Sequence, residues 1–183
     1  MREVDKRTRV SRRVFLSSGA TIVPAAALAV VGMTIDAGET WAQSAKTLKP
    51  HTMATLARMA RDIYPHDRLA DVYYIKAVSG YDALAAKDAK LAKMIEDGVT
   101  ALDAAAQKSH KTTYMTVPWE DNRVALLTAA DKTPLFQKLR GDLVVSLYNN
   151  PEIWTKFGYE GASADKGGYI TRGFDDINWL PTA

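Results

Sequence analysis

The chain has 183 residues, with 24 basic and 21 acidic side chains and no cysteine. Without cysteine it cannot carry covalently attached haem, an iron–sulfur cluster or thiol chemistry of its own. Most of the excess positive charge lies before residue 45, since 18 basic and 17 acidic residues follow. This near-neutral remainder gives no electrostatic argument for nucleic-acid binding, and its roughly 140 residues fit one domain.

The first 44 residues are typical of an export signal. A basic segment comes first, an uncharged stretch covers 14–35, and small residues surround 40–45. This is the order of a basic region, an apolar region and a cleavage site. Where the first two meet stands a twin-arginine (Tat) motif, formed by Ser11, Arg12, Arg13, Phe15 and Leu16. We therefore expect the Tat translocase to deliver the chain to the periplasm, with cleavage after Ala42 or Ser44.

The uncharged stretch is also open to interpretation as a membrane anchor. Its 22 residues, 14–35, are close to the length that a bilayer-spanning helix needs. However, serine, threonine, glycine and proline residues within it make it only mildly apolar. This composition favours a cleaved signal, whereas an uncleaved one would keep the protein associated with the membrane.

Hydrophobic periodicity predicts an all-α domain of about five helices over residues 45–157. A first helix is expected over 51–64, where Pro65 would end it. Asp67 is expected to cap a second helix, and Gly80 on its inward face indicates a close helix crossing. The other residues of that face are Tyr73, Ala77, Tyr81 and Leu84.

Three further helices are predicted in the second half of the domain. The third covers 87–108, and the fourth covers 119–130 with Val124 and Leu127 inward, after a short extended piece at 114–117. Thr133 and Pro134 form the N-cap and first position of the fifth, which runs to residue 148. Its stripe consists of Leu135, Leu139, Leu143 and Leu147. After Asn149 and Asn150, Pro151 begins one more turn.

Residues 158–183 are expected to form an irregular tail rich in glycine and aromatic residues. They fit no hydrophobic period, yet they are too aromatic for a free disordered segment. We expect them to pack on their own bundle or on a partner protein. The candidate partner contacts are Trp154, Tyr159, Tyr169, Arg172, Phe174, Asp175, Asp176 and Trp179.

No catalytic, cofactor-binding or metal-binding motif is recognisable. Asp62 and His66 are four residues apart, but Pro65 interrupts the helix between them, so a polar turn is favoured over a metal site. The glycines fit neither a phosphate loop nor a dinucleotide fingerprint. We therefore expect no bound cofactor and no catalysis by this chain alone.

Two residue groups have a structural and a chemical interpretation. Asp175 and Asp176 are adjacent, so on an extended segment their carboxylates point to opposite sides. This favours a turn or an ion pair over catalysis. The tryptophans Trp119, Trp154 and Trp179 are interpreted as core or interface rather than as a cofactor-binding box.

Three stretches resemble the small-subunit (subunit 3) family of gluconate 2-dehydrogenase. The first is the Tat motif, and the second is the segment 60–67, Ala-Arg-Asp-Ile-Tyr-Pro-His-Asp. The third is the C-terminal region, in three pieces: 147–154 (Leu-Tyr-Asn-Asn-Pro-Glu-Ile-Trp), 157–161 (Phe-Gly-Tyr-Glu-Gly) and 168–181, which contains Arg-Gly-Phe-Asp-Asp-Ile at 172–177. This region departs from the branch best known for gluconate oxidation, so the substrate stays open.

The resemblance implies a partner. Members of that family accompany a large FAD-binding oxidoreductase of the glucose–methanol–choline type, which oxidises a sugar or alcohol hydroxyl. A membrane-bound multihaem cytochrome c often accepts the electrons. The expected role is a non-catalytic small subunit that aids maturation and Tat export of the large one. The alternatives are a stand-alone periplasmic helical enzyme or binding protein, and a signal-anchored scaffold.

Overall fold

The computed structural model describes residues 41–170, and the predicted all-α fold is confirmed there: no strand occurs among these residues. The main helices are α3 (Pro50–Ile63), α4 (Asp71–Val78), α5 (Tyr81–Lys87), α6 (Ala89–His110), α7 (Glu120–Ala129) and α8 (Pro134–Ser146). The shorter elements are α9 (Pro151–Trp154) and the 3-10 turns η2 (Tyr114–Thr116), η3 (Thr155–Phe157) and η4 (Ala164–Lys166). The Tat motif and residues 171–183 lie outside the described part.

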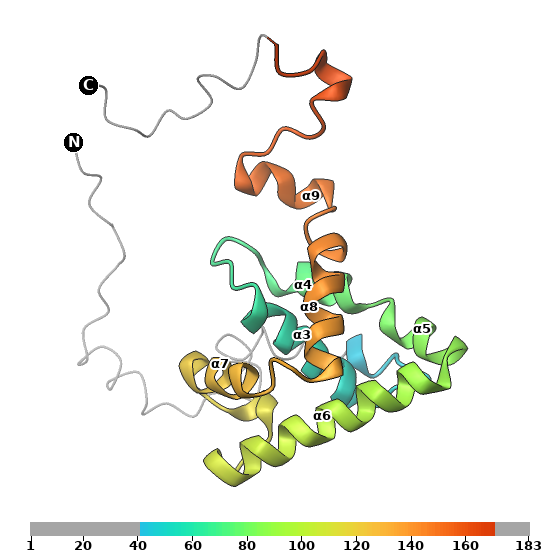
Figure 1. The fold of residues 1–183 in the computed structure, drawn as a ribbon, viewed down its shortest axis with the longest axis vertical. Helices are drawn as coiled ribbons and strands as arrows, with labels where there is room; N and C mark the ends of the chain where they lie inside the picture. Colours follow the sequence, from blue (N-terminus) through green and yellow to red (C-terminus); the bar gives the residue numbers. More distant parts are fainter. Residues whose placement is uncertain (1–40, 171–183) are drawn as a thin grey trace, which may run out of the picture. The chain divides into compact units, whose positions relative to one another are not determined.

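Helix α3 occupies the centre of the bundle. It contacts α4, α6, α7, α8 and η2, and Figure 1 shows it enclosed by these elements with α6 running beneath them. Its consecutive residues 52–56 are all buried, so every side of the helix faces protein. The hydroxyl of Thr55 donates to the His51 carbonyl at 2.8 Å. This bond gives the buried hydroxyl the hydrogen-bond partner that it needs.

The predicted stripe of α8 is confirmed as core. Thr133 caps the helix by accepting from the Phe136 N–H, and Pro134 takes the first position. The residues that α8 and the facing α6 bury are Leu135, Leu139, Leu143 and Leu147 with Ile95, Val99, Leu102 and Ala106. A four-residue spacing places such side chains above one another on one helix face, which is why the sequence located this part of the core.

The close crossing of helices lies at Gly98 of α6, not at Gly80. A Cβ atom on Gly98 would lie 2.7 Å from both Cβ and Cδ2 of Leu135, whereas one on Gly80 would meet nothing within 4 Å. The prediction for Gly80 is therefore wrong. Without a side chain, Gly98 lets α6 and α8 approach each other closely.

The predicted second helix is two helices. Ser79 and Gly80 separate α4 from α5, since glycine weakens a helix and the Ser79 hydroxyl donates to the Lys76 carbonyl at 2.8 Å. Tyr81 is buried as predicted. The other buried residues are Tyr74, Val78 and Ala85, each one position after the residue expected, and Leu84 is 49 % exposed. The N-cap of α4 is Ala70, so Asp67 does not cap this helix.

Two smaller predictions were also wrong. The expected extended piece at 114–117 is the 3-10 turn η2, which lets the Tyr114 side chain enter the core. On α7, Val124 is exposed while Arg123 is buried, because Arg123 has an acidic partner inside the bundle. Trp119, just before this helix, is 72 % exposed, so of its two interpretations, core or interface, the core one does not hold.

None of the helices within residues 41–170 combines the length and the apolar character that crossing a membrane requires.

Candidate functional site

The segments 60–67 and 147–157 meet in one group of aromatic side chains. We call it the His66 cluster, consisting of Tyr64, His66, Tyr148 and Phe157. His66 Nε2 lies 2.6 Å from the Tyr148 hydroxyl oxygen. The Tyr148 ring packs edge-on against Tyr64 and His66, with centroids 5.6 Å apart in each case. The Phe157 ring lies 4.9 Å from that of His66. Such edge contacts are the favoured geometry of aromatic pairs.

Local capping places each member of the cluster. Helix α3 ends before Pro65, so the chain turns and presents His66. On the other side, the Asn150 side chain accepts from the Glu152 N–H, and Pro151 starts α9. The Trp154 indole N–H donates to the Tyr148 carbonyl at 2.7 Å. This bond holds α9 against the end of α8 and fixes the position from which Phe157 reaches His66.

The surroundings of His66 favour its neutral form. Partial burial lowers the pKa of the imidazole, and the nearby Arg61 guanidinium lowers it further. Burial raises the pKa of the Tyr148 phenol, and the neighbouring Tyr64 adds to this effect. The His66 and Tyr148 side chains therefore form one hydrogen bond as two neutral groups. This bond holds the turn after α3 against the segment that follows α8.

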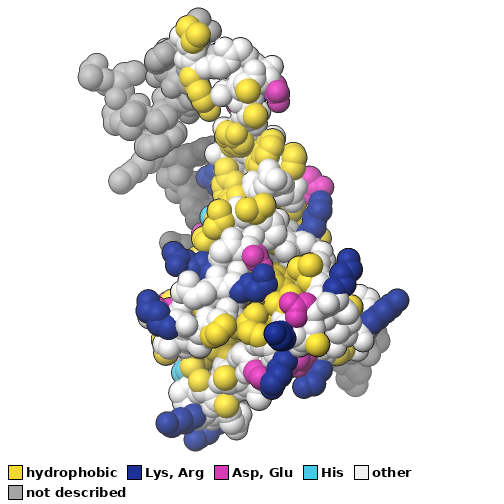
Figure 2. Space-filling model, turned by 45° about the vertical axis from the view of Figure 1, so that its right-hand side comes forward, with side chains coloured by type: hydrophobic (Ala, Val, Ile, Leu, Met, Phe, Trp, Pro, Cys, Tyr) yellow, Lys and Arg dark blue, Asp and Glu magenta, His cyan; other side chains and the backbone are white. Residues whose placement is uncertain are grey.

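Exposed apolar side chains follow the cluster along the chain. Phe157 and Tyr159 are partly exposed, Tyr169 is 62 % exposed and Ile170 is 87 % exposed. On the outer side of α8, Val144 and Val145 are also exposed. Figure 2 shows hydrophobic side chains gathered at the end of the molecule that carries α9 and the residues after it, while lysine and arginine are concentrated lower down. Contiguous exposed apolar surface is typical of interaction sites, and these residues are the candidates for one.

The candidate partner contacts fall into two groups. Trp154 is half-buried, and Tyr159 packs edge-on against it with the ring centroids 5.2 Å apart. Tyr169 is exposed. The others, Arg172, Phe174, Asp175, Asp176 and Trp179, lie outside the described residues, as do Ser11, Arg12, Arg13, Phe15 and Leu16.

Asp62 and His66 do not converge on a metal site. Asp62 is buried and accepts from Arg123 Nε at 2.7 Å and from Arg123 Nη2 at 3.0 Å. The Tyr114 hydroxyl donates to the same carboxylate at 2.6 Å. Arg123 Nη1 also donates to the Val117 carbonyl at 2.9 Å. Within residues 41–170, no three metal-ligating side chains lie together.

This buried network joins α3, η2 and α7, and it was missed from the sequence. Burial and the Asp62 carboxylate raise the pKa of the Tyr114 phenol well above its ordinary value, so the hydroxyl stays protonated and donates. The available signal was the position of Arg123, four residues before the buried Leu127 and therefore on the inward face of α7. A charge on an apolar face needs an opposite charge, and Asp62 on α3 provides it.

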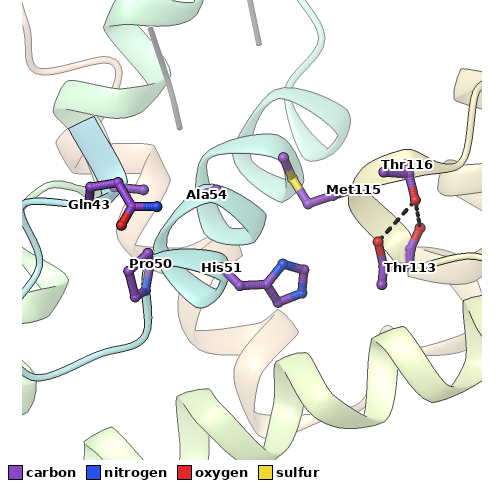
Figure 3. A pocket seen from close by; sticks show the side chains of 8 residues that line it. Gln43, Pro50, His51, Ala54, Thr113, Met115 and Thr116 are labelled. Atoms are coloured by element: carbon purple, nitrogen blue, oxygen red, sulfur yellow. Dashed lines mark hydrogen bonds between the residues drawn. The ribbon is translucent and has the colours of Figure 1, made fainter. Parts of the chain in front are cut away.

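A separate pocket of about 250 Å³ lies where the chain enters the domain. Figure 3 shows Gln43 and Pro50 at one end of the lining and Thr113 and Thr116 at the other, with His51 between them. His51 Nε2 lies 2.6 Å from Asp103 Oδ2, and Asp103 Oδ1 accepts from the Tyr114 N–H at 2.9 Å. The carboxylate thus orients the imidazole, but it also anchors η2 to α6.

Comparison of the chain with protein-family models, with curated proteins and with solved structures found no match.

Proposed function

We propose that this chain is the non-catalytic small subunit of an exported, FAD-dependent sugar or alcohol dehydrogenase. It escorts the large flavin-binding subunit through the Tat translocase to the periplasm, where a multihaem cytochrome c is the expected electron acceptor. The observation that carries the proposal is the His66 cluster. Two of the stretches that resemble the small-subunit family, 60–67 and 147–157, are distant in the sequence and meet there.

The surface beside the cluster supports a role in binding a protein. Phe157 belongs to the cluster and is partly exposed, and Tyr159, Tyr169 and Ile170 continue the apolar surface along the tail. Aromatic side chains are common anchors at protein interfaces. A surface that starts on a rigid cluster and continues into the tail suits a large partner better than a small ligand.

The ionisable side chains of the bundle support a non-catalytic role. Asp62, Arg123 and Tyr114 are engaged with one another inside the domain. The Tyr81 hydroxyl donates to Asp142 at 2.6 Å. Burial is the main reason why the pKa of this phenol is raised, and the bond to Asp142 adds to the effect. These groups hold helices together, whereas a catalytic acid or base needs access to a substrate.

A stand-alone binding protein would need a ligand site, and the pocket beside His51 is the candidate for one. Its volume, about 250 Å³, is below the roughly 300–1,000 Å³ of ordinary ligand pockets. His51 is also committed to Asp103, which holds η2 in place. For these reasons the subunit role is the better supported of the two.

The test is export of the flavoprotein in the chain's own host. An affinity-tagged full chain should recover a large FAD-binding protein, and replacing Arg12 and Arg13 by lysine should leave both proteins in the cytoplasm. A matched control replaces Arg7 and Arg9 by lysine, which changes the same residue type outside the motif and should leave export intact. Recovery of the chain without flavin from cells with active dehydrogenase would contradict the proposal.

A further inference from the structure

Residues 41–45, around the predicted cleavage site, are part of the folded domain. Ala42 is 2 % exposed and belongs to the hydrophobic core, against which Trp41 also packs. The Ser44 N–H donates to the Trp41 carbonyl at 3.0 Å, and the Ala45 N–H donates to the Ala42 carbonyl at 3.1 Å. The Ser44 hydroxyl donates to the Trp41 carbonyl as well, at 2.7 Å. The segment is thus a closed turn with a buried side chain.

The next four residues are fastened to the domain by their backbone. The N–H groups of Lys46, Thr47 and Leu48 all donate to the Asp82 carboxylate, at 3.0, 2.9 and 2.8 Å. The N–H of Lys49 donates to Glu96 at 2.9 Å. We call residues 46–49 with these two carboxylates the entry clamp. Bonds from backbone amides to a carboxylate are charge-assisted and strong, so the clamp fixes the chain directly after the turn.

Both candidate cleavage bonds, Ala42–Gln43 and Ser44–Ala45, lie inside this turn. Proteolysis is concentrated at exposed, weakly bonded backbone. Hydrolysis of either bond would require the turn to open and Ala42 to leave the core. A protein exported through the Tat route is folded before it crosses the membrane, so the turn is already closed when a signal peptidase meets it.

We infer that neither bond is cut and that the mature subunit keeps its leader. This inference rests on the Tat export proposed above. These are the two bonds at which the sequence predicts cleavage, and the fold closes both. The uncharged stretch 14–35 then stays covalently attached to the exported domain, as the anchor interpretation requires.

The test is the intact mass of the full chain recovered from the cell envelope after export with its partner. We expect a mass of 20.1 kDa, that of all 183 residues. A shorter chain, beginning at Gln43, at Ala45 or anywhere between Met1 and these residues, would overturn the inference. Failure of export would instead leave the chain in the cytoplasm, so the two proposals fail in different fractions.

A variant and a peptide test the reason for retention. Replacing Asp82 by alanine removes the acceptor for Lys46, Thr47 and Leu48, and we expect cut chains to appear beside the full-length one. Asp97→Ala on the exposed side of α6 is the matched control. Independently, purified signal peptidase should cut a peptide of residues 30–50 and leave the folded chain intact. Equal cutting of both, or no cutting of the peptide, would overturn protection by the fold.

Discussion

His66 and Tyr148 lie 82 positions apart in the sequence, and their side chains meet at 2.6 Å. This bond closes the α3–α4 turn onto the end of α8. The His66 N–H also donates to the Tyr74 hydroxyl at 3.1 Å, and that hydroxyl donates to the Tyr64 carbonyl at 2.7 Å. The surface proposed for the partner therefore starts from a turn that is fixed at several points.

We expect the folded domain to lose stability as the pH falls below about 6.5, the ordinary pKa of histidine. Burial and Arg61 lower the pKa of His66 in the folded state. The unfolded chain therefore takes up the proton first, and the free energy of unfolding falls until the pH has passed the folded pKa. The groups that face this imidazole are Arg61 of α3, Tyr148 and Phe157.

Urea denaturation of the purified full chain between pH 5 and 8 measures this effect. His66→Gln should flatten the dependence, and His110→Gln, which changes a histidine outside the cluster, should leave it as in the wild type. A His66→Gln variant with an unchanged pH profile would show that the imidazole does not titrate as expected.

Asp62→Ala should destabilise the domain by about 3–5 kcal/mol, the usual cost of breaking a buried ion pair. The substitution leaves the Arg123 guanidinium buried without its carboxylate and removes the acceptor of the Tyr114 hydroxyl. Lys93→Ala is the control, because it breaks an exposed i,i+4 pair with Asp97 and should cost at most about 0.5 kcal/mol. Denaturant melts compare the two. Equal, small losses would mean that the buried pair contributes nothing specific.

Gly98→Ala and Gly141→Ala should change stability in opposite directions. The new methyl at Gly98 would lie 2.7 Å from Leu135 Cβ, so α6 and α8 must separate, at a cost of about 1–3 kcal/mol. At Gly141 of α8 a methyl meets nothing within 4 Å, and the better helix propensity should add about 0.5–1 kcal/mol. Thermal or denaturant unfolding of both variants is the measurement. A neutral Gly98→Ala would show that the helices can adjust without cost.

The regular parts of this fold could be predicted because their signals are local. The α8 stripe and the Thr133–Pro134 start depend on spacing and capping within a few residues, and the structure has both. The break at Ser79–Gly80 was missed because glycine within a periodic pattern was interpreted as a packing contact. Whether a glycine separates helices or lets them approach depends on what faces it, and the residue that faces Gly98 is Leu135, which belongs to a different helix, α8.

The candidate site was harder to predict than the helices. Asp62 pairs with Arg123, and His66 with Tyr148, only once α3 lies beside α7 and α8. Such pairs are determined by tertiary packing between distant segments. The hydrophobic period of a single helix does not indicate which residues of other helices it will contact. The sequence did single out both segments of the His66 cluster through their family-like strings, although it gave no indication that they meet.

Truncation after Tyr159 should separate folding from partner binding. The retained end still has the Trp154–Tyr159 ring contact and the bond from the Tyr159 N–H to the Trp154 carbonyl, at 2.9 Å. The removed part begins with side chains that are largely exposed, such as Tyr169 and Ile170. We therefore expect the helical content, measured by circular dichroism, and the denaturation midpoint to change little.

Binding should respond differently to the same truncation. The removed residues include Tyr169, Arg172, Phe174 and Trp179. Loss of even one or two aromatic or arginine anchors costs about 1–4 kcal/mol, which is about fivefold to nearly a thousandfold in affinity. Co-purification of the flavoprotein with the truncated chain measures this. Val72→Ala is the control, because it shortens an exposed apolar side chain on α4, outside the tail, and should leave the complex intact. A truncated chain that recovers its partner in full yield would show that the tail is not the interface, whereas loss of the helical fold itself would mean that the tail covers its own bundle.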